Sequence, residues 1–474
     1  MILGDAGPQL ASFLRIPMPM IVAARLARIG GMVSMNGMNT TFLDRLVGLP
    51  RSSRIAALAE LLPDSLHHDS IAGVEALGVR GGRASGLARL AAIDPQAYAR
   101  TRNHVAGAVT RLSPWLRHGV LSLAEVRDAA LAGVDEPAHA EKLISELGWR
   151  DYWRQVHAAL GDRIRAPIEP PAARSRLNTV DRMPDDVLDG RTGMACIDAF
   201  VRQLQRTGWL HNHERMWLAS WLVHVRGVRW QAGAGWFLSH LLDGDPASNH
   251  LSWQWVAGTF SAKPYLFNRE NLERYTDGLH CRACPVAGHC DVEGSYEALA
   301  ERLFVDAAPP PRAPLRIPPA APWRLGAGDP AGRPLVWLTL DSLSAASPAA
   351  VRHPGAPRIF VLDPAWLEAE RPALKRLAFI FECLADIEGV EVAMGSPAAV
   401  LPAAARRSRC THVAVADTPC PRVRAAAAAI AADMPVQVIE EPVFCDRRRV
   451  RDLGRFSRFW SQVSASALVP TRRE

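Results

Sequence analysis

Lysine is almost missing from this chain. It occurs only at positions 142, 263 and 375, so nearly all of the 55 basic residues are arginine. The guanidinium of arginine is a planar fork of donors, so contacts to phosphate or carboxylate would be bidentate. With a net charge of +7 and a pI of about 9.2, this composition favours an anionic partner such as nucleic acid.

Long apolar runs are absent too. No uninterrupted stretch is long enough to span a membrane, and the N-terminus lacks the basic and apolar regions of a signal peptide. We therefore expect a cytoplasmic monomer with no membrane partner. Its eight cysteines would stay reduced unless they bind metal.

The length and the patterning predict a multidomain protein. A chain of 474 residues with 49% hydrophobic and 22% charged residues is globular and large enough for two or three domains. Helical periodicity dominates residues 75–304, and a proline-rich segment at 305–333 reads as a linker. No role follows from the pattern of residues 1–74, and residues 447–474 read as a basic surface arm.

Beyond the linker the periodicity changes to that of an α/β domain, over residues 334–446. Five short apolar runs are bounded by turn residues, and helical stretches lie between some of them. Strands that alternate with helices predict a parallel, Rossmann-like sheet. The five expected strands are RPLVWLTL, APRIFVLD, VEVAMGS, THVAVAD and PVQVIEE.

The densest cluster of polar and aromatic residues is DGDPASNHLSWQW, residues 243–255. Asp243 to Pro246 predict a turn that leads into a helix, because proline suits the first helical turn and acids suit its dipole. Asn249 and Trp253 would then share one face of that helix. Trp253 alone could be ordinary core, but the whole cluster is hard to explain by packing.

Four motifs in register resemble the photolyase and cryptochrome family. TRLSPWLRHGVLS, SELGWRDYW, TGWLHNHERM and DGDPASNHLSWQW occur in the order of that family's helical FAD-binding domain, and the resemblance covers residues 98–275. The resemblance implies an all-α FAD-binding domain, which the α/β domain follows in this chain. FAD is the cofactor that it implies.

The resemblance also implies a set of flavin contacts. Thr110, Arg111, Leu112 and Ser113 match a pyrophosphate-binding segment at a helix start, which fits the donors exposed there. Arg215 would pair with Asp243, because a buried charge needs a partner. Asp245 would accept from the flavin ring edge, and Asn249 would lie beside the flavin N5. The remaining positions that match flavin contacts are Tyr98, Arg150, Asn212 and Gly244.

Two further groups of matches concern electrons and DNA. Trp253 matches the tryptophan nearest the flavin, and Trp230 matches the next one; no convincing third tryptophan lies between residues 153 and 209. Trp149 and Trp255 match the pair that flanks a flipped pyrimidine dimer, which needs a stacking wall. Glu146 and Met216 match lesion contacts, although Trp149 and Met216 without their motifs would read as helix core.

The cysteines allow several interpretations. Cys281, Cys284 and Cys290 form a CxxC with a third thiol close by, which is metal-ligand spacing. Zinc or plain loop thiols would explain that spacing. One bacterial branch of the family carries a [4Fe–4S] cluster on four cysteines, and Cys196 matches the fourth. That resemblance implies an iron–sulfur cluster here. Cys383, Cys410, Cys420 and Cys445 read as buried thiols.

The domain order is unusual, because the family's α/β antenna domain ordinarily comes first. Here the C-terminal segment resembles it, which predicts a circular permutation; an unrelated Rossmann-like domain is the alternative. Asp341-Ser342-Leu343 replaces the usual Asp-Leu-Arg, so the antenna pigment stays unassigned.

The function implied is a light-driven DNA photolyase, in which reduced FAD splits a dimer in UV-damaged DNA by electron transfer. A cryptochrome-like photoreceptor without repair activity is the alternative from another class. A flavoprotein with a purely structural cluster is a third.

Overall fold

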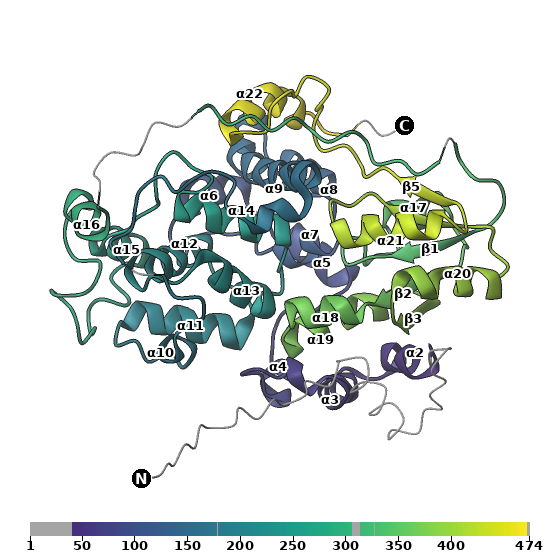
Figure 1. Cartoon of the computed structure of the whole chain (residues 1–474), viewed down its shortest axis with the longest axis horizontal. Coiled ribbons are helices and arrows are strands. Elements are labelled where there is room, and N and C mark those ends of the chain that lie inside the picture. The colour runs from purple at the N-terminus through teal and green to yellow at the C-terminus, as the bar shows by residue number, and fades with distance from the viewer. Residues whose placement is uncertain (1–39, 178, 306–312, 327, 472–474) are drawn as a thin grey trace, which may run out of the picture.

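The computed structural model describes residues 40–471 except 178, 306–312 and 327, and the side chains of residues 40–42 are left aside. Much of the predicted N-terminal segment therefore lies outside the described residues, as do parts of the predicted linker and the last three residues of the predicted arm. Figure 1 shows a helical domain beside an α/β domain. Among the described residues, no helix is both long and apolar enough to cross a membrane.

The helical domain contains the amphipathic helices that the sequence predicts, with the longest, α9 (Glu141–Leu160), at its centre. Helix α14 (Pro246–Ala257) begins at the predicted turn, where Asp245 caps it and Pro246 occupies its first position. Helix α9 packs against α14, and α13 packs against α14 as well. The α-helices of this domain are α5 (Arg83–Ala91), α6 (Pro95–Thr101), α7 (Ser113–Arg117), α8 (Leu123–Ala132), α9, α10 (Asp185–Leu188), α11 (Ala195–Thr207), α12 (Asn212–Ser220), α13 (Trp230–His240), α14, α15 (Arg269–Thr276) and α16 (Tyr296–Leu303).

The α/β domain is a parallel five-stranded sheet in the order β3-β2-β1-β4-β5. All five strands fall on the predicted apolar runs. Successive residues point to opposite faces: Val336 joins the core shared with the helical domain, and Trp337 joins the core on the other face. The elements are β1 (Pro334–Leu338), α17 (Pro348–Arg352), β2 (Arg358–Leu362), α18 (Pro364–Glu370), α19 (Leu374–Ala385), β3 (Val390–Met394), α20 (Pro397–Arg407), β4 (His412–Ala416), α21 (Pro421–Ala431) and β5 (Val436–Ile439).

The described part of the N-terminal segment, residues 40–75, covers an edge of that sheet. Helices α2 (Thr40–Gly48), α3 (Arg51–Leu61) and α4 (Ile71–Glu75) lie against α19 and β3 (Figure 1). The Val392 N–H of edge strand β3 donates to Asp44 at 2.6 Å, and Arg51 pairs with Glu382 at 2.6 Å. An open edge would expose unpaired backbone groups, so these helices complete the α/β domain.

The C-terminal segment differs from the predicted surface arm. Helix α22 (Phe456–Ala467) buries Phe459 and Val463 completely and packs against α9. The prediction of an arm is wrong for this helix, because apolar residues four positions apart give it a buried face that the basic residues around it obscure in the sequence. Residues 313–326 of the proline-rich segment run past α22 (Figure 1), and the Ile317 carbonyl accepts from Leu453 N–H at 2.7 Å.

The interface between the two domains buries a histidine. His118 is fully buried between the carbonyls of Leu340 at 3.0 Å and Leu242 at 3.2 Å. Burial, together with Arg117 and Arg376, lowers the pKa of His118 to about 3. The unfolded chain therefore takes up a proton near pH 6.5 that the folded chain does not.

Stability is therefore expected to fall as the pH drops below about 6.5. At pH 5 the penalty from His118 alone is about 2 kcal/mol. Urea unfolding at pH 7.5 and pH 5 measures the fall in the free energy of unfolding. In His118→Gln this fall should be smaller by about 2 kcal/mol. An equal decline in the variant would contradict the assignment to His118.

Candidate functional site

A central pocket opens between α9, α12, α13 and α14 of the helical domain. It gathers residues from three of the sequence motifs that lie far apart in the chain. Its lining consists of Glu146, Trp149, Arg150, Trp153, Asn212, Arg215, Met216, Ala219, Phe237, Leu241, Asp243, Asp245, Ser248, Asn249, Ser252, Trp253 and Val256.

Asp243 is a buried carboxylate of the central pocket that is paired with an arginine. Arg215 Nη2 lies 2.9 Å from Asp243 Oδ2, and the Asp243 side chain is 5% exposed. This is the ion pair that the sequence predicts. Despite burial, the Arg215 charge keeps the pKa of Asp243 below its usual value, with a contribution from the Ser113 hydroxyl. Asp243 Oδ1 is buried, and it accepts no hydrogen bond from the residues that the structure describes.

Asp245 has two tasks at the start of α14. Its carboxylate accepts from the backbone N–H of Ala247 and of Ser248, which caps the helix, and from the Ser248 hydroxyl at 2.7 Å. Arg150 Nη2 lies 3.9 Å from Asp245 Oδ2. Although burial opposes it, the charges of Arg150 and Arg117 hold the pKa of Asp245 well below its usual range. Asp245 is therefore an anion at the wall of the pocket.

Asn249 and Trp253 lie on the pocket face of α14, as their spacing predicts. The Asn249 amide donates through Nδ2 to the Ala234 carbonyl at 2.8 Å, which fixes its orientation. Trp253 is 2% exposed, and its ring meets Phe237 edge-on at 5.0 Å. A Cβ on Gly233 would lie 2.2 Å from the indole, so the ring depends on glycine at that position.

The rim of the central pocket is formed by α9 and α12. Glu146 pairs with Arg102 at 3.0 Å and with Lys142 at 3.4 Å. The Trp149 ring is stacked on Phe456 of α22, with centroids 3.8 Å apart and planes 13° apart. Stacking on Phe456 fixes the orientation of the Trp149 indole, so this rim presents an ordered aromatic ring beside the Glu146 carboxylate.

The other residues that the sequence assigns to this site lie outside the lining. Trp230 meets His250 edge-on at 6.0 Å, and Trp255 packs against Tyr265 at 5.5 Å. The guanidinium of Arg111 lies 4.4 Å from the centre of the Trp209 ring. The remaining residues outside it are Tyr98, Thr110, Leu112, Ser113 and Gly244. Trp149 and Trp255 therefore do not share this pocket.

The four predicted ligand cysteines line one small cavity, which we call the cysteine cavity. Cys196 begins the buried side of α11, and Cys281, Cys284 and Cys290 come from the loop after α15. Burial raises the pKa of Cys196 to about 12, and the three other thiols add to the shift. Among the described residues, no three His, Cys, Asp or Glu side chains converge closely enough to hold a single metal ion.

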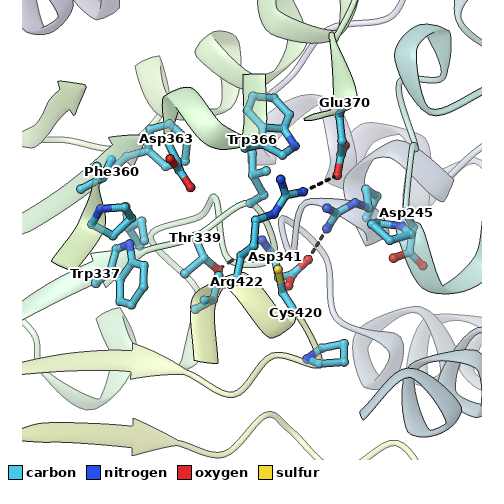
Figure 2. A pocket seen from close by; sticks show the side chains of 18 of the residues that line it. Asp245, Trp337, Thr339, Asp341, Phe360, Asp363, Trp366, Glu370, Cys420 and Arg422 are labelled. Atoms are coloured by element: carbon cyan, nitrogen blue, oxygen red, sulfur yellow. Dashed lines mark hydrogen bonds and ion pairs between the residues drawn. The ribbon is translucent and has the colours of Figure 1, made fainter. Parts of the chain in front are cut away.

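An interdomain pocket lies where β1, β2 and β4 end. Figure 2 shows Trp337, Phe360 and Trp366 in its wall, with Asp341 paired to an arginine. Ligands of open α/β sheets bind at the carboxyl ends of the strands, beside the point where the strand order reverses. Aromatic walls and carboxylates suit a planar ring that carries hydrogen-bond donors.

Comparison with known proteins agrees with the geometry of the central pocket. Residues 143–278 match the model of the FAD binding domain of DNA photolyase. The chain therefore contains a domain of the photolyase/cryptochrome type, the FAD-binding domain. The deoxyribodipyrimidine photo-lyase of Streptomyces griseus is 41% identical over 32% of this chain and 32% of its own. The cryptochrome DASH of Natronomonas pharaonis is 32% identical over 48% of this chain and 53% of its own.

Solved structures of the photolyase/cryptochrome family match only part of the chain. A bacterial class III photolyase from Agrobacterium tumefaciens is 28% identical, with a TM-score of 0.34 over 43% of this chain and 44% of its own. The chain likewise spans only part of the curated relatives that it matches in sequence, between 28% and 53% of their length.

From the sequence alone, no role is assigned to two arginines that the structure places behind the central pocket. Arg117 and Arg376 both donate to the Gly244 carbonyl at 2.8 Å. Arg117 follows the TRLSP motif, so its position offers a weak signal. Arg376 lies in the α/β domain, and nothing in its local sequence points to the helical domain. Phe456 is missed for the same reason, because its contact with Trp149 spans most of the chain.

Proposed function

We propose that this chain is a light-driven DNA photolyase that uses reduced FAD to split UV-induced pyrimidine dimers. One observation carries the proposal: three of the four residues assigned to the lesion line the same pocket as several residues assigned to the flavin. Glu146, Trp149 and Met216 form its rim, and Asp243, Asn249 and Trp253 form its floor. A receptor without repair activity has no need of the first group.

The polar groups of the floor fit a flavin. Asp243 Oδ1 is a buried acceptor with no donor among the described residues, and a buried acceptor of this kind is costly unless a ligand N–H satisfies it. Asp245 is held as an anion beside it. When bound in reduced form and excited by light, FAD supplies the electron that dimer splitting requires. The protein's own part is to bind the ring, orient it and exclude water.

The rim groups suit a flipped base. Enzymes that act on a base in DNA take it out of the stack and hold it against aromatic side chains. Trp149 offers such a surface, and its stack on Phe456 fixes it in place. Glu146 can accept hydrogen bonds from a pyrimidine edge. The positive net charge of the chain supports binding to the DNA backbone.

We also propose that Cys196, Cys281, Cys284 and Cys290 hold a [4Fe–4S] cluster. This proposal is supported by the four thiols, which come from two distant segments and line one cavity. Four thiolates are the usual ligand set of such a cluster. Zinc is the other metal that this ligand set could take.

Light-dependent repair tests the proposed function. Purified reduced protein is mixed with DNA that carries defined cyclobutane or (6-4) lesions, and blue light is compared with darkness. Loss of one lesion only under light supports a photolyase and names its substrate. A flavin-loaded protein that repairs neither lesion would instead support the photoreceptor alternative.

Trp149→Ala is expected to slow this repair by about tenfold or more at limiting DNA, because stacking on an aromatic ring contributes about 1–3 kcal/mol per base. Trp323→Ala is the matched control, since Trp323 packs against Arg424 in the α/β domain. The flavin content of each variant is measured alongside. Equal repair by both flavin-loaded variants would remove Trp149 from the lesion wall.

A further inference from the structure

The turn that carries Asp243 and Asp245 is held in place by two hydrogen bonds to the carbonyl of the residue between them, Gly244. Gly244 O accepts from Arg376 Nη2 and from Arg117 Nε, each at 2.8 Å. Arg117 also forms an ion pair with Asp341 of the α/β domain. Both hydrogen bonds to the turn therefore depend on the α/β domain, one directly and one through Arg117.

Arg376 connects the turn to the helix before it. It lies in α19 and its side chain is 0% exposed. Its Nη1 donates to the Leu238 carbonyl in the last turn of α13 at 2.5 Å and lies 2.9 Å from Glu370 Oε2. Carbonyls at a helix C-terminus lack partners within the helix and favour a nearby cation. One guanidinium thus ties the end of α13 to the turn that follows it.

The space around Gly244 is fitted to this guanidinium. A Cβ at Gly244 would lie 3.0 Å from Arg376 Cζ and 3.1 Å from the Leu241 carbonyl oxygen. A side chain at this position would push the arginine away from the turn. The glycine of the DGD motif therefore serves the contact with the α/β domain, as well as the turn itself.

We propose that Arg376 is a positioning residue for the flavin, so that the α/β domain sets the FAD affinity of the helical domain. The proposal rests on FAD binding in the central pocket, as in the proposed function. Arg376 touches neither carboxylate; it fixes the backbone between them. Asp243 must face both Arg215 and the ligand, and Asp245 must cap α14, so a small shift of the backbone displaces both.

The test compares two neighbouring residues of α19. Lys375 is as buried as Arg376 and pairs with Asp69 at 2.7 Å, with side-chain exposures of 0% and 3%. The Arg376–Glu370 pair has the same exposures. Lys375 contacts the N-terminal segment and His240, and it makes no hydrogen bond to the turn. Arg376→Met and Lys375→Met therefore remove similar buried charges, and only the first removes one of the two donors to Gly244 O.

FAD affinity is measured by titrating the flavin-free full chain with FAD, and thermal unfolding of the same flavin-free samples is recorded. We expect FAD to bind Arg376→Met at least about tenfold more weakly than wild type, since a charge-assisted hydrogen bond is lost. Lys375→Met should stay within about threefold of wild type at a similar melting temperature. Equal affinity of the two variants would overturn the proposal.

Arg376→Lys keeps the charge beside Glu370. This variant tests the positioning role of Arg376 if Arg376→Met does not fold. An ammonium cannot reproduce the planar fork that reaches two carbonyls and a carboxylate. FAD binding about tenfold weaker in Arg376→Lys supports the positioning role, and wild-type affinity overturns it. If the wild-type chain does not bind FAD, both proposals fail; if it binds FAD without repairing DNA, only the repair function fails.

Discussion

Asp243→Asn is expected to weaken FAD binding by about a hundredfold. A hydrogen bond to a charged group contributes up to about 3 kcal/mol, and the flavin would lose such a bond to the Asp243 carboxylate. The substitution also replaces one oxygen of the carboxylate by a donor, so the buried acceptor faces the pocket in only one of two orientations. The measurement is an FAD titration of the flavin-free chain, together with the flavin content after gel filtration.

A surface ion pair of the same type supplies the control. Asp186 lies 2.8 Å from Arg226, and both side chains are substantially exposed. Exposed pairs contribute about 0–1 kcal/mol, so Asp186→Asn should bind FAD within about threefold of wild type. A folded Asp243→Asn chain with wild-type affinity would show that the flavin does not use this carboxylate.

The pocket floor could be predicted from the sequence because its residues are local to motifs. Asp245, Asn249 and Trp253 belong to one turn and one helix, whose caps and spacing fix their relative positions. The Arg215–Asp243 pair could be predicted because the resemblance places two opposite charges in one site. The five strands were predictable for a similar reason, since each is a short apolar run between turn residues.

Contacts between distant segments could not be predicted in this way. The stack of Phe456 on Trp149 and the bond from Arg376 to Gly244 each join parts of the chain that no local pattern relates. Helices α2 to α4 give no sign in their sequence that they cover the edge of a sheet formed some 300 residues later. The circular permutation stays a prediction, but the two domains share one hydrophobic core, in which Trp115 meets Phe379.

Cys196→Ser is expected to abolish most of the metal content. Cys196 is the only one of the four thiols that comes from a helix, α11, and the only buried one. Its pKa is raised to about 12 and that of Cys281 to about 11, mainly by burial. Thiols with such pKa values stay protonated at neutral pH without metal, so metal binding must displace their protons. Serine, a much poorer ligand, would leave three thiolates around an opened site.

The measurement is iron and acid-labile sulfide per chain, with the visible absorption of anaerobically purified protein. Wild type should hold about four of each, the content of a [4Fe–4S] cluster, and Cys196→Ser should hold less than about one. Cys410→Ser is the control, because Cys410 is a buried thiol that donates to the Pro334 carbonyl in the α/β domain. About one zinc per wild-type chain, without sulfide, would assign the cavity to zinc. Equal metal content in wild type and Cys196→Ser would show that the metal lies elsewhere, because the Cys196 side chain lines the cysteine cavity and its loss should remove a ligand there.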